Sequence, residues 1–327
     1  MYGWLIVSLH VPPAFPATQR HAADALFASV RNAAAEKLAR LAWLDGLFKQ
    51  WAVEKIRGMK TLIWPPDGLL TDEGLMQAYA SWFENETTVS TSFFKAWLKA
   101  ASARQRQLTE GGSGSRGEAC LASAKAPPRN YALPYFAYDG LLNTVSVSVA
   151  AILSPYFRGP DVNAMRHAGV GLAYALELVR AFDPSGAVKF DAKSDLVNAS
   201  VLAAWRDQIA KKEPANSTLC AAQTSTAGNP KTGALTAQFF PAVPAMELAH
   251  KVFEASLGLK DGTRRAADDL NEERVFFITA CLVMCPCPGS FNRYRFDCNR
   301  AVANFEPFRR AFNCPNRVEP NKCGFFN

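Results

Sequence analysis

The chain has 327 residues, of which 49% are hydrophobic, so it is long enough for one large or two ordinary domains and can bury a sizeable core. Lysine and arginine outnumber aspartate and glutamate by 36 to 29, which gives a net charge of +7. The basic residues are scattered and form no stripe, so we expect a solvated basic surface and no nucleic-acid partner. The apolar run at residues 3–11 is too short to span a bilayer and lacks the basic flank of a signal peptide, so neither a membrane span nor an export signal is expected in this chain.

Helical periodicity dominates the first hundred residues. Residues 22–60 repeat apolar positions at steps of three and four, on a stripe that includes Leu47, and this predicts two or more helices. The sequence Thr71–Glu73 has the capping chemistry that opens another helix, and residues 93–108 are helical again. Residues 110–117 then have the glycine and serine content of a flexible linker, which makes them the best candidate for a domain boundary.

One strand and three helices are expected after the linker. Residues 144–149 alternate with a period of two, which is typical of a half-buried strand. Residues 163–182, 245–258 and 271–284 have helical spacing. Two roles stay open for the strand: it could receive an extended peptide by β-augmentation, or it could be a core strand without a ligand.

The cysteines and glycosylation sequons indicate an oxidising compartment. Six of the eight cysteines lie from Cys281 onward, and none forms the paired C-x-x-C units of a structural zinc site. Sequons at Asn85, Asn198 and Asn216 fit a secreted glycoprotein. The sequence leaves the pairing of four cysteines open: Cys120, Cys281, Cys287 and Cys298.

Several segments, in a fixed order along the chain, carry recognisable motifs. Residues 42–65 contain AWLD, AVEK and IWP, and residues 149–157 read VAAILSPYF. Residues 272–277 read EERVFF, with a Met-Cys pair at 284–285, and residues 304–326 contain NFEPFRRAFNC and NKCGFF. Together these segments resemble the neprilysin and endothelin-converting-enzyme family of zinc metallopeptidases, which has W-[ML]-D, A-x-E-K, G-I-L-Q-P-P-F-F and N-x-x-x-F-x-x-A-F-x-C motifs in the same order.

The resemblance implies a mainly α fold with a small β-sheet, made of a thermolysin-like catalytic lobe and a helical remnant of the family's first lobe. Residues 1–104 would be this remnant, residues 105–130 a linker or insertion rich in glycine and serine, and residues 131–327 a degenerate neprilysin-like peptidase domain. The family's membrane anchor and most of its first lobe would lie upstream of the sequence. We therefore interpret the chain as a truncated product, a gene-model fragment or a reduced paralogue, with an extracellular or cell-surface location implied by the resemblance.

The family's zinc helix, H-E-x-x-H-G-F-D, corresponds to residues 176–183, which read LELVRAFD. In the family, two histidines one helical turn apart hold the zinc ion, and the glutamate between them is the general base. Here Leu176 has no lone pair to donate, and Arg180 stays protonated and repels a dication. Only Glu177 remains, and we interpret it as a vestigial carboxylate that pairs with Arg180.

The third zinc ligand and its supporting aspartate also have no counterpart. Alignment of residues 249–253 with the family's A-Y-R-A-Y segment places Gln238 at the ligand position. The same alignment places Ala242 where the family has an aspartate that orients a ligand histidine. All three zinc-ligand positions are therefore predicted to be substituted, and we expect no cofactor although the family uses zinc.

Two of the family's substrate contacts correspond to residues of this chain. The family binds the peptide backbone through an Asn-Ala pair, of which Ala137 remains. A substrate-binding arginine corresponds to Arg295, or to Arg293 if the register differs by two residues. No counterpart of a family histidine that assists the transition state is found near Ser290.

The resemblance also assigns cysteines. It pairs Cys220 with Cys323, and such a bridge typically contributes about 2–4 kcal/mol. Cys285 and Cys314 match family cysteines whose partners belong to the first lobe, so the missing N-terminal lobe would be their partner.

We therefore expect a neprilysin-family homologue that is catalytically inactive and retains at most peptide or partner binding. The alternative is an active zinc metalloendopeptidase, as family membership implies. A replacement metal site is not expected, because the four histidines form no pair at ligand spacing, and a capping or packing role is expected for His167. The four histidines are His10, His21, His167 and His250.

Overall fold

The computed structural model describes two compact units, one within residues 1–21, 63–135 and 147–150 and the other within residues 22–62, 136–146 and 151–327. The predicted linker and domain boundary at residues 105–130 lie outside the described part of the chain and stay a prediction. The described residues are 11, 14–65, 67–83, 94–95, 98, 101–102, 135–140, 142–152, 157, 163–182, 207–208, 241–258, 265–267, 270–284, 298–303, 305–314 and 324–326.

The first unit contains helix α4 (Asp72–Phe83), whose start is the one predicted from capping chemistry. The backbone N–H of Gly74 donates to the side-chain oxygen of Thr71 at 3.2 Å. Two carboxylates in the first turn favour the same helix end, because they face the positive end of its dipole. The rings of Phe15 and Trp64 pack at 5.5 Å in the same unit. Two short 3-10 turns cover Asp67–Leu69 and Val149–Ile152.

Two helices, α2 (Ala17–Arg40) and α3 (Gly46–Arg57), account for the periodic segment at residues 22–60 and confirm its prediction. Helix α3 begins at Asp45, whose carboxylate accepts a hydrogen bond from the N–H of Leu47 at 2.8 Å. Because a new helix starts at this cap, the apolar positions of α2 do not continue in register into α3. Leu47 is therefore 71% exposed and does not lie on the buried stripe that the sequence predicted. The buried face of α2 consists of Ala23, Leu26, Phe27, Val30, Ala34, Ala35 and Leu38.

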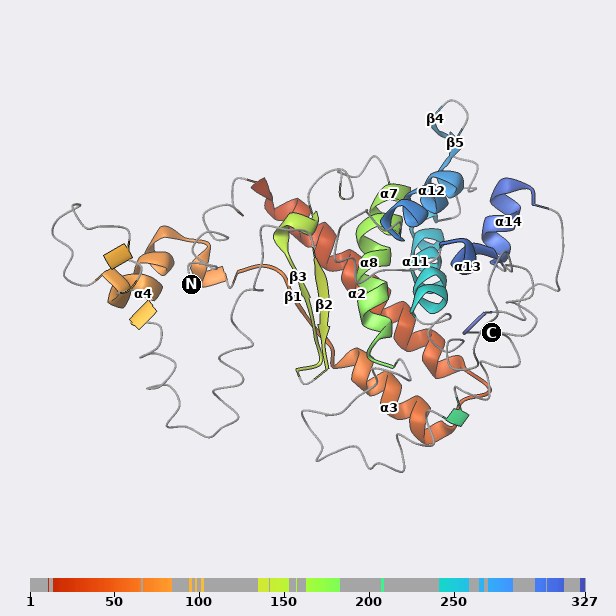
Figure 1. Ribbon diagram of the computed structural model, residues 1–327, viewed down its shortest axis with the longest axis horizontal. Helices are drawn as coiled ribbons and strands as arrows, with labels where there is room; N and C mark the ends of the chain where they lie inside the picture. Colours follow the sequence, from red (N-terminus) through yellow and green to blue (C-terminus); the bar gives the residue numbers. More distant parts are fainter. Residues whose placement is uncertain are drawn as a thin grey trace. The chain divides into compact units, whose positions relative to one another are not determined.

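A three-stranded sheet lies in the second unit (Figure 1). Its strands are β1 (Lys60–Leu62), β3 (Thr144–Val147) and β2 (Phe136–Asp139), in the order β1-β3-β2, and β1 is parallel to β3. The central strand β3 uses both of its backbone edges, and Val145 is fully buried. Of the two roles left open for this strand, the structure therefore supports the core strand, and β2 is an edge of the sheet.

The helices predicted after the strand are all present. A continuous helical run consists of α7 (Asn163–Arg166), a π-helical turn (His167–Gly171) and α8 (Leu172–Val179). It is followed by α11 (Ala242–Leu257) and α12 (Glu272–Met284). Helix α8 is buried along its whole length and packs between β2 and α11 (Figure 1). The expected fold class, mainly α with a small sheet, is confirmed.

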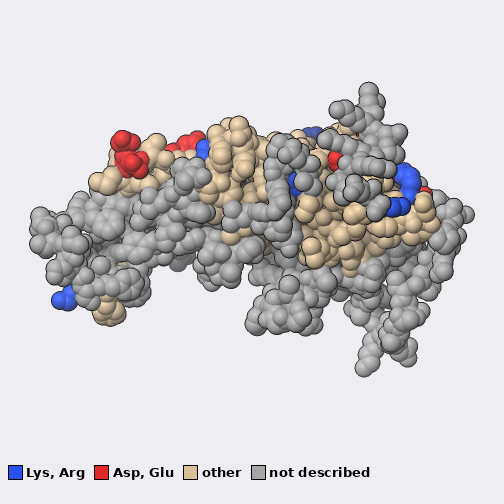
Figure 2. Space-filling model, turned by 90° about the horizontal axis from the view of Figure 1, so that it is seen from above, with Lys and Arg blue, Asp and Glu red and all other residues tan. Residues whose placement is uncertain are grey.

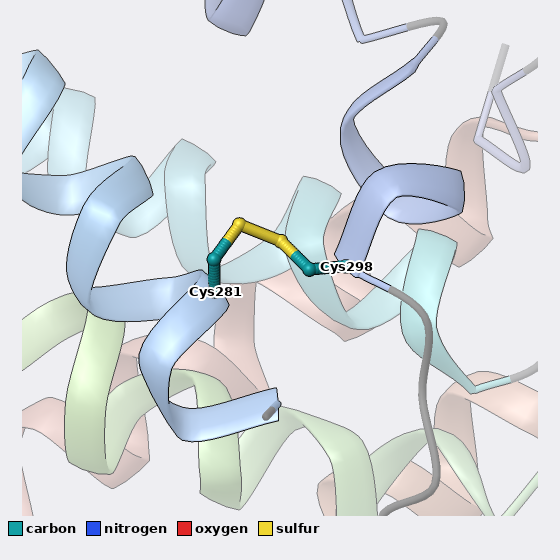
Figure 3. Close-up of a disulfide and its surroundings, with 2 residues drawn as sticks. All are labelled: Cys281 and Cys298. Atoms are coloured by element: carbon teal, nitrogen blue, oxygen red, sulfur yellow. A yellow bond between two sulfur atoms is a disulfide. The ribbon is translucent and has the colours of Figure 1, made fainter. Parts of the chain in front are cut away.

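The C-terminal elements are α13 (Cys298–Ala303), α14 (Glu306–Phe312) and a small antiparallel hairpin of β4 (Arg265–Ala267) and β5 (Leu270–Asn271). A disulfide joins Cys281 of α12 to the first residue of α13 (Figure 3). It decides one pairing that the sequence left open, and it fixes α13 against α12.

Other cysteine predictions are not decided by the structure. Cys220, Cys323 and Cys285 lie outside the described residues, so the predicted bridge between Cys220 and Cys323 stays a prediction. Cys314 is partly exposed and is a free cysteine among the residues that the structure describes.

The surface of the described part bears scattered charge. On the face shown in Figure 2, described lysines and arginines form small separate groups, and red carboxylates lie beside some of them. Within the described helices, none combines the length and the apolar character that a bilayer crossing requires.

Candidate functional site

Glu177 is a fully buried carboxylate on α8, at the contact of this helix with β2. The apolar sequence around it places the helix in the core, so the carboxylate leaves water and needs partners inside the protein. Its Oε2 accepts a hydrogen bond from the backbone N–H of Tyr138 on β2 at 2.9 Å. The Nε of Arg180 lies 3.5 Å from the same oxygen.

Arg180 follows the last residue of α8 and is 29% exposed at its side chain. Its backbone N–H donates to the carbonyl of Glu177 at 3.1 Å, which closes the last turn. A cation at this end of a helix is favoured by the dipole as well as by the carboxylate. The predicted ion pair of Glu177 and Arg180, three residues apart on one helix face, is confirmed.

The remaining predicted residues are distributed over the same contacting elements. Leu176 is buried on α8, and Ala242 is buried at the start of α11, which packs against α8. Ala137 lies on the edge strand β2 and is partly exposed. The structure thus brings α8, β2 and α11 together, whereas Gln238 and Arg295 lie outside the described residues.

His167 is buried in the π-helical turn and has a packing role, as predicted. Its Nδ1 lies 2.8 Å from the carbonyl oxygen of Asn163, and its ring lies 6.0 Å from that of Phe253. The pKa of His167 falls to about 4, mainly because the ring is buried. The hydrogen bond with Asn163 raises this pKa and the charge of Arg166 lowers it, both by less than burial does. The imidazole is therefore neutral at pH 7.

A second cluster of functional groups was missed by the sequence reasoning. His250 and Glu254 of α11 lie near Glu273 of α12, with ligand atoms that are all within 4.8 Å of one another. The sequence contains no pair of histidines at ligand spacing, but a histidine and a glutamate four residues apart also share a helix face. That spacing was a usable signal for two of the three residues, whereas Glu273 comes from a separate helix.

The comparisons with known proteins identify the family. The model described as Peptidase family M13 matches residues 136–322, which is more than half of the chain. The chain belongs to this family. It is 23% identical over 191 residues to the neprilysins of Mus musculus and Homo sapiens, and the match covers 58% of this chain and 24% of each neprilysin. The predicted resemblance to the neprilysin family is confirmed.

Solved structures show the same fold. A structure of PepO from Lactobacillus rhamnosis HN001 has a TM-score of 0.63 at 20% identity and covers 99% of this chain. A partially open Mycobacterium tuberculosis zinc metalloprotease 1 has a TM-score of 0.66 at 18% identity and also covers 99% of this chain. The match spans 49% and 51% of those two chains, so this M13 chain spans about half of their length and about a quarter of the neprilysins.

The expectation that the chain has no cofactor is wrong, because membership of the family implies zinc. One of the solved structures with the same fold is a zinc metalloprotease, so zinc is the cofactor to consider. The described residues at the zinc-helix positions do not fit the ion, since Leu176 has no donor atom and Arg180 is a cation. The carboxylate of Glu177 is already bound to a backbone N–H and a guanidinium. No hydrolytic step through zinc follows from these residues.

Proposed function

We propose that this chain is a pseudopeptidase of family M13, a neprilysin-family homologue that no longer hydrolyses peptides and retains at most peptide or partner binding. The observation that carries the proposal is the state of Glu177. A general base must reach the proton that it removes, and in a metallopeptidase it acts on a metal-bound water. Glu177 instead neutralises Arg180 and accepts the N–H of Tyr138.

The interactions of the Glu177 carboxylate favour a structural role for it. A hydrogen bond to a charged group contributes about 1.5–3 kcal/mol, so releasing Glu177 from Tyr138 would cost a comparable amount. Breaking the pair with Arg180 would also remove a favourable ionic contact of a buried charge. In this proposal Arg180 occupies the place of a metal ligand and balances the charge that a metal would balance in the family.

Peptide binding is proposed at the edge strand β2. An edge strand presents backbone N–H and C=O groups with which an extended peptide can pair. Ala137 is on this edge, whereas the N–H of Tyr138 is already used by Glu177. The binding of a peptide would therefore use the backbone around Ala137, with Arg295 as a further proposed contact.

An extracellular or cell-surface location is part of the proposal. The disulfide of Cys281 and Cys298 supports it, because such bonds persist in oxidising compartments. The sequons predict N-linked glycans, which a shift in gel mobility after deglycosylation would reveal. Pairing of Cys285 and Cys314 with a first lobe also stays a proposal, and the free Cys314 is accessible enough for it.

The second candidate function is an active zinc metalloendopeptidase, which family membership favours. It would need zinc ligands other than the described residues at the zinc-helix positions. The two functions are separated by incubating the full chain with a mixed peptide pool and added zinc. The proposal expects peptides to be retained by the protein and recovered intact. Recovery of cleaved peptides only when no chelator is present would support the active enzyme and contradict the proposal.

A further inference from the structure

A cluster of one histidine and two glutamates lies where α11, α12 and α14 meet, and nothing in the proposed function uses it. We infer that His250, Glu254 and Glu273 form a binding site for one divalent transition-metal ion, with Zn²⁺ as the best fit. This inference does not depend on whether the chain hydrolyses peptides.

The geometry of the three side chains fits a single small cation. The Nδ1 of His250 lies 3.7 Å from Oε2 of Glu254, and its Nε2 lies 3.9 Å from Oε1 of Glu273. Two ligands of a tetrahedral zinc ion, each about 2.1 Å from the metal, lie about 3.4 Å apart. One ligand atom from each residue falls within 4.8 Å of the others, so closure to about 3.4 Å needs a movement of up to about 1.4 Å. Glu254 can supply it, since its side chain is 47% exposed.

The histidine is held in place and has an unused nitrogen. His250 is 2% exposed and is packed between the rings of Phe276, Phe277 and Phe305, at 5.2 to 5.3 Å. Its Nε2 is buried and has no hydrogen-bond partner among the described residues. A buried nitrogen without a partner costs free energy, and a metal ion beside Glu273 would satisfy it.

The protonation state of the imidazole suits a metal. Burial, with smaller contributions from the charges of Arg310 and Lys37, lowers the pKa of His250 to about 3. The ring is therefore neutral at pH 7 and keeps a lone pair for a ligand bond.

The two carboxylates of the cluster already attract one cation, the guanidinium of Arg310. The Nη2 of Arg310 donates to Oε1 of Glu273 at 3.0 Å and lies 3.7 Å from Oε1 of Glu254. Its side chain is 59% exposed, so it can turn towards solvent when a dication takes its place between the carboxylates. We therefore expect Arg310 to compete with the metal.

The donor set indicates the class of metal. One imidazole nitrogen and two carboxylate oxygens suit zinc and its neighbours in the first transition row, whereas Mg²⁺ and Ca²⁺ prefer oxygen ligands alone. Three protein ligands leave one tetrahedral position, which water can fill.

The test is zinc titration of the full chain by calorimetry, with its free thiols alkylated so that cysteines cannot bind the metal. The wild-type protein should bind one equivalent, and Glu254→Gln or Glu273→Gln should weaken binding by about tenfold or more. The control is Glu36→Gln, which makes the same charge change in the exposed pair of Glu36 and Arg40 and should leave binding unchanged. Arg310→Gln should tighten binding, because it removes the competing cation.

The exposed position of Glu254 keeps the test interpretable, since its substitution should leave the circular dichroism spectrum unchanged. His250→Gln is a second variant. If this change at a buried position prevents folding, the two glutamate variants still decide the question. Absence of zinc binding by the wild-type chain would overturn the inference. So would equal affinity of Glu254→Gln and Glu36→Gln, because the carboxylates would then serve only as ion-pair partners of Arg310.

Discussion

The central ion pair predicts a specific loss of stability when Arg180 is replaced by alanine. Glu177 is fully buried, so without the guanidinium its carboxylate would keep the N–H of Tyr138 but lose the favourable charge of Arg180. The full chain should therefore unfold more easily, and the effect should disappear when the carboxylate is also neutralised.

The expected magnitude follows from the burial of the two partners. Removing one member of a buried pair costs about 3–5 kcal/mol. The side chain of Arg180 is 29% exposed, and solvent reduces the interaction at its distance of 3.5 Å. We expect Arg180→Ala to lower the free energy of unfolding by about 2 kcal/mol, with most of this recovered in the double variant with Glu177→Gln.

The assay is urea unfolding of the wild type, the two single variants and the double variant at pH 7. Arg40→Ala is the matched control, because Arg40 pairs with Glu36 on an exposed helix face. This substitution should change the free energy of unfolding by less than about 0.5 kcal/mol. If Arg180→Ala cost no more than Arg40→Ala, the reasoning that Glu177 needs a buried countercharge would be refuted.

Acid should weaken the fold through His167, whose pKa of about 4 lies below its ordinary value of 6.5. As the pH falls, the unfolded chain binds this proton before the folded protein does, so acid favours unfolding. Between pH 7 and pH 5 the free energy of unfolding of the wild type should fall by about 2 kcal/mol more than that of His167→Gln. Parallel pH profiles of the two proteins would contradict this. A second buried carboxylate, Glu247, accepts the N–H groups of Phe325 and Phe326 at 2.7 and 3.1 Å. Glu247→Gln should lower the free energy of unfolding by about 2 kcal/mol and release Phe325 and Phe326. If amide exchange at these two residues were unchanged, Glu247 would not hold them in place.

Local features of the fold were predictable from the sequence. The start of α4 follows from capping at Thr71, and the helical spacing located α8, α11 and α12 to within a few residues. The pair of Glu177 and Arg180 was predictable because both residues lie on one turn of one helix.

Features that depend on distant segments were not predictable. A period of two cannot show that β1 would pair with β3 on the side opposite β2, so the strand was expected to be only half-buried. The hydrogen bond from Tyr138 to Glu177 joins a strand to a helix 39 residues away. Glu273 approaches His250 only because α12 packs near α11, and the sequence carries no local trace of that contact. Substitutions in the motif also gave no reason to expect a metal, although family membership implies one.

The rate of peptide hydrolysis by the purified full chain, compared with that of Glu177→Gln in the presence of zinc, tests the account most directly. A pseudopeptidase predicts that both proteins leave a mixed peptide pool intact, at the rate of the buffer alone, with or without a chelator. Cleavage by the wild type that a chelator stops and that Glu177→Gln abolishes would show that Glu177 still acts as a base, and would contradict the account.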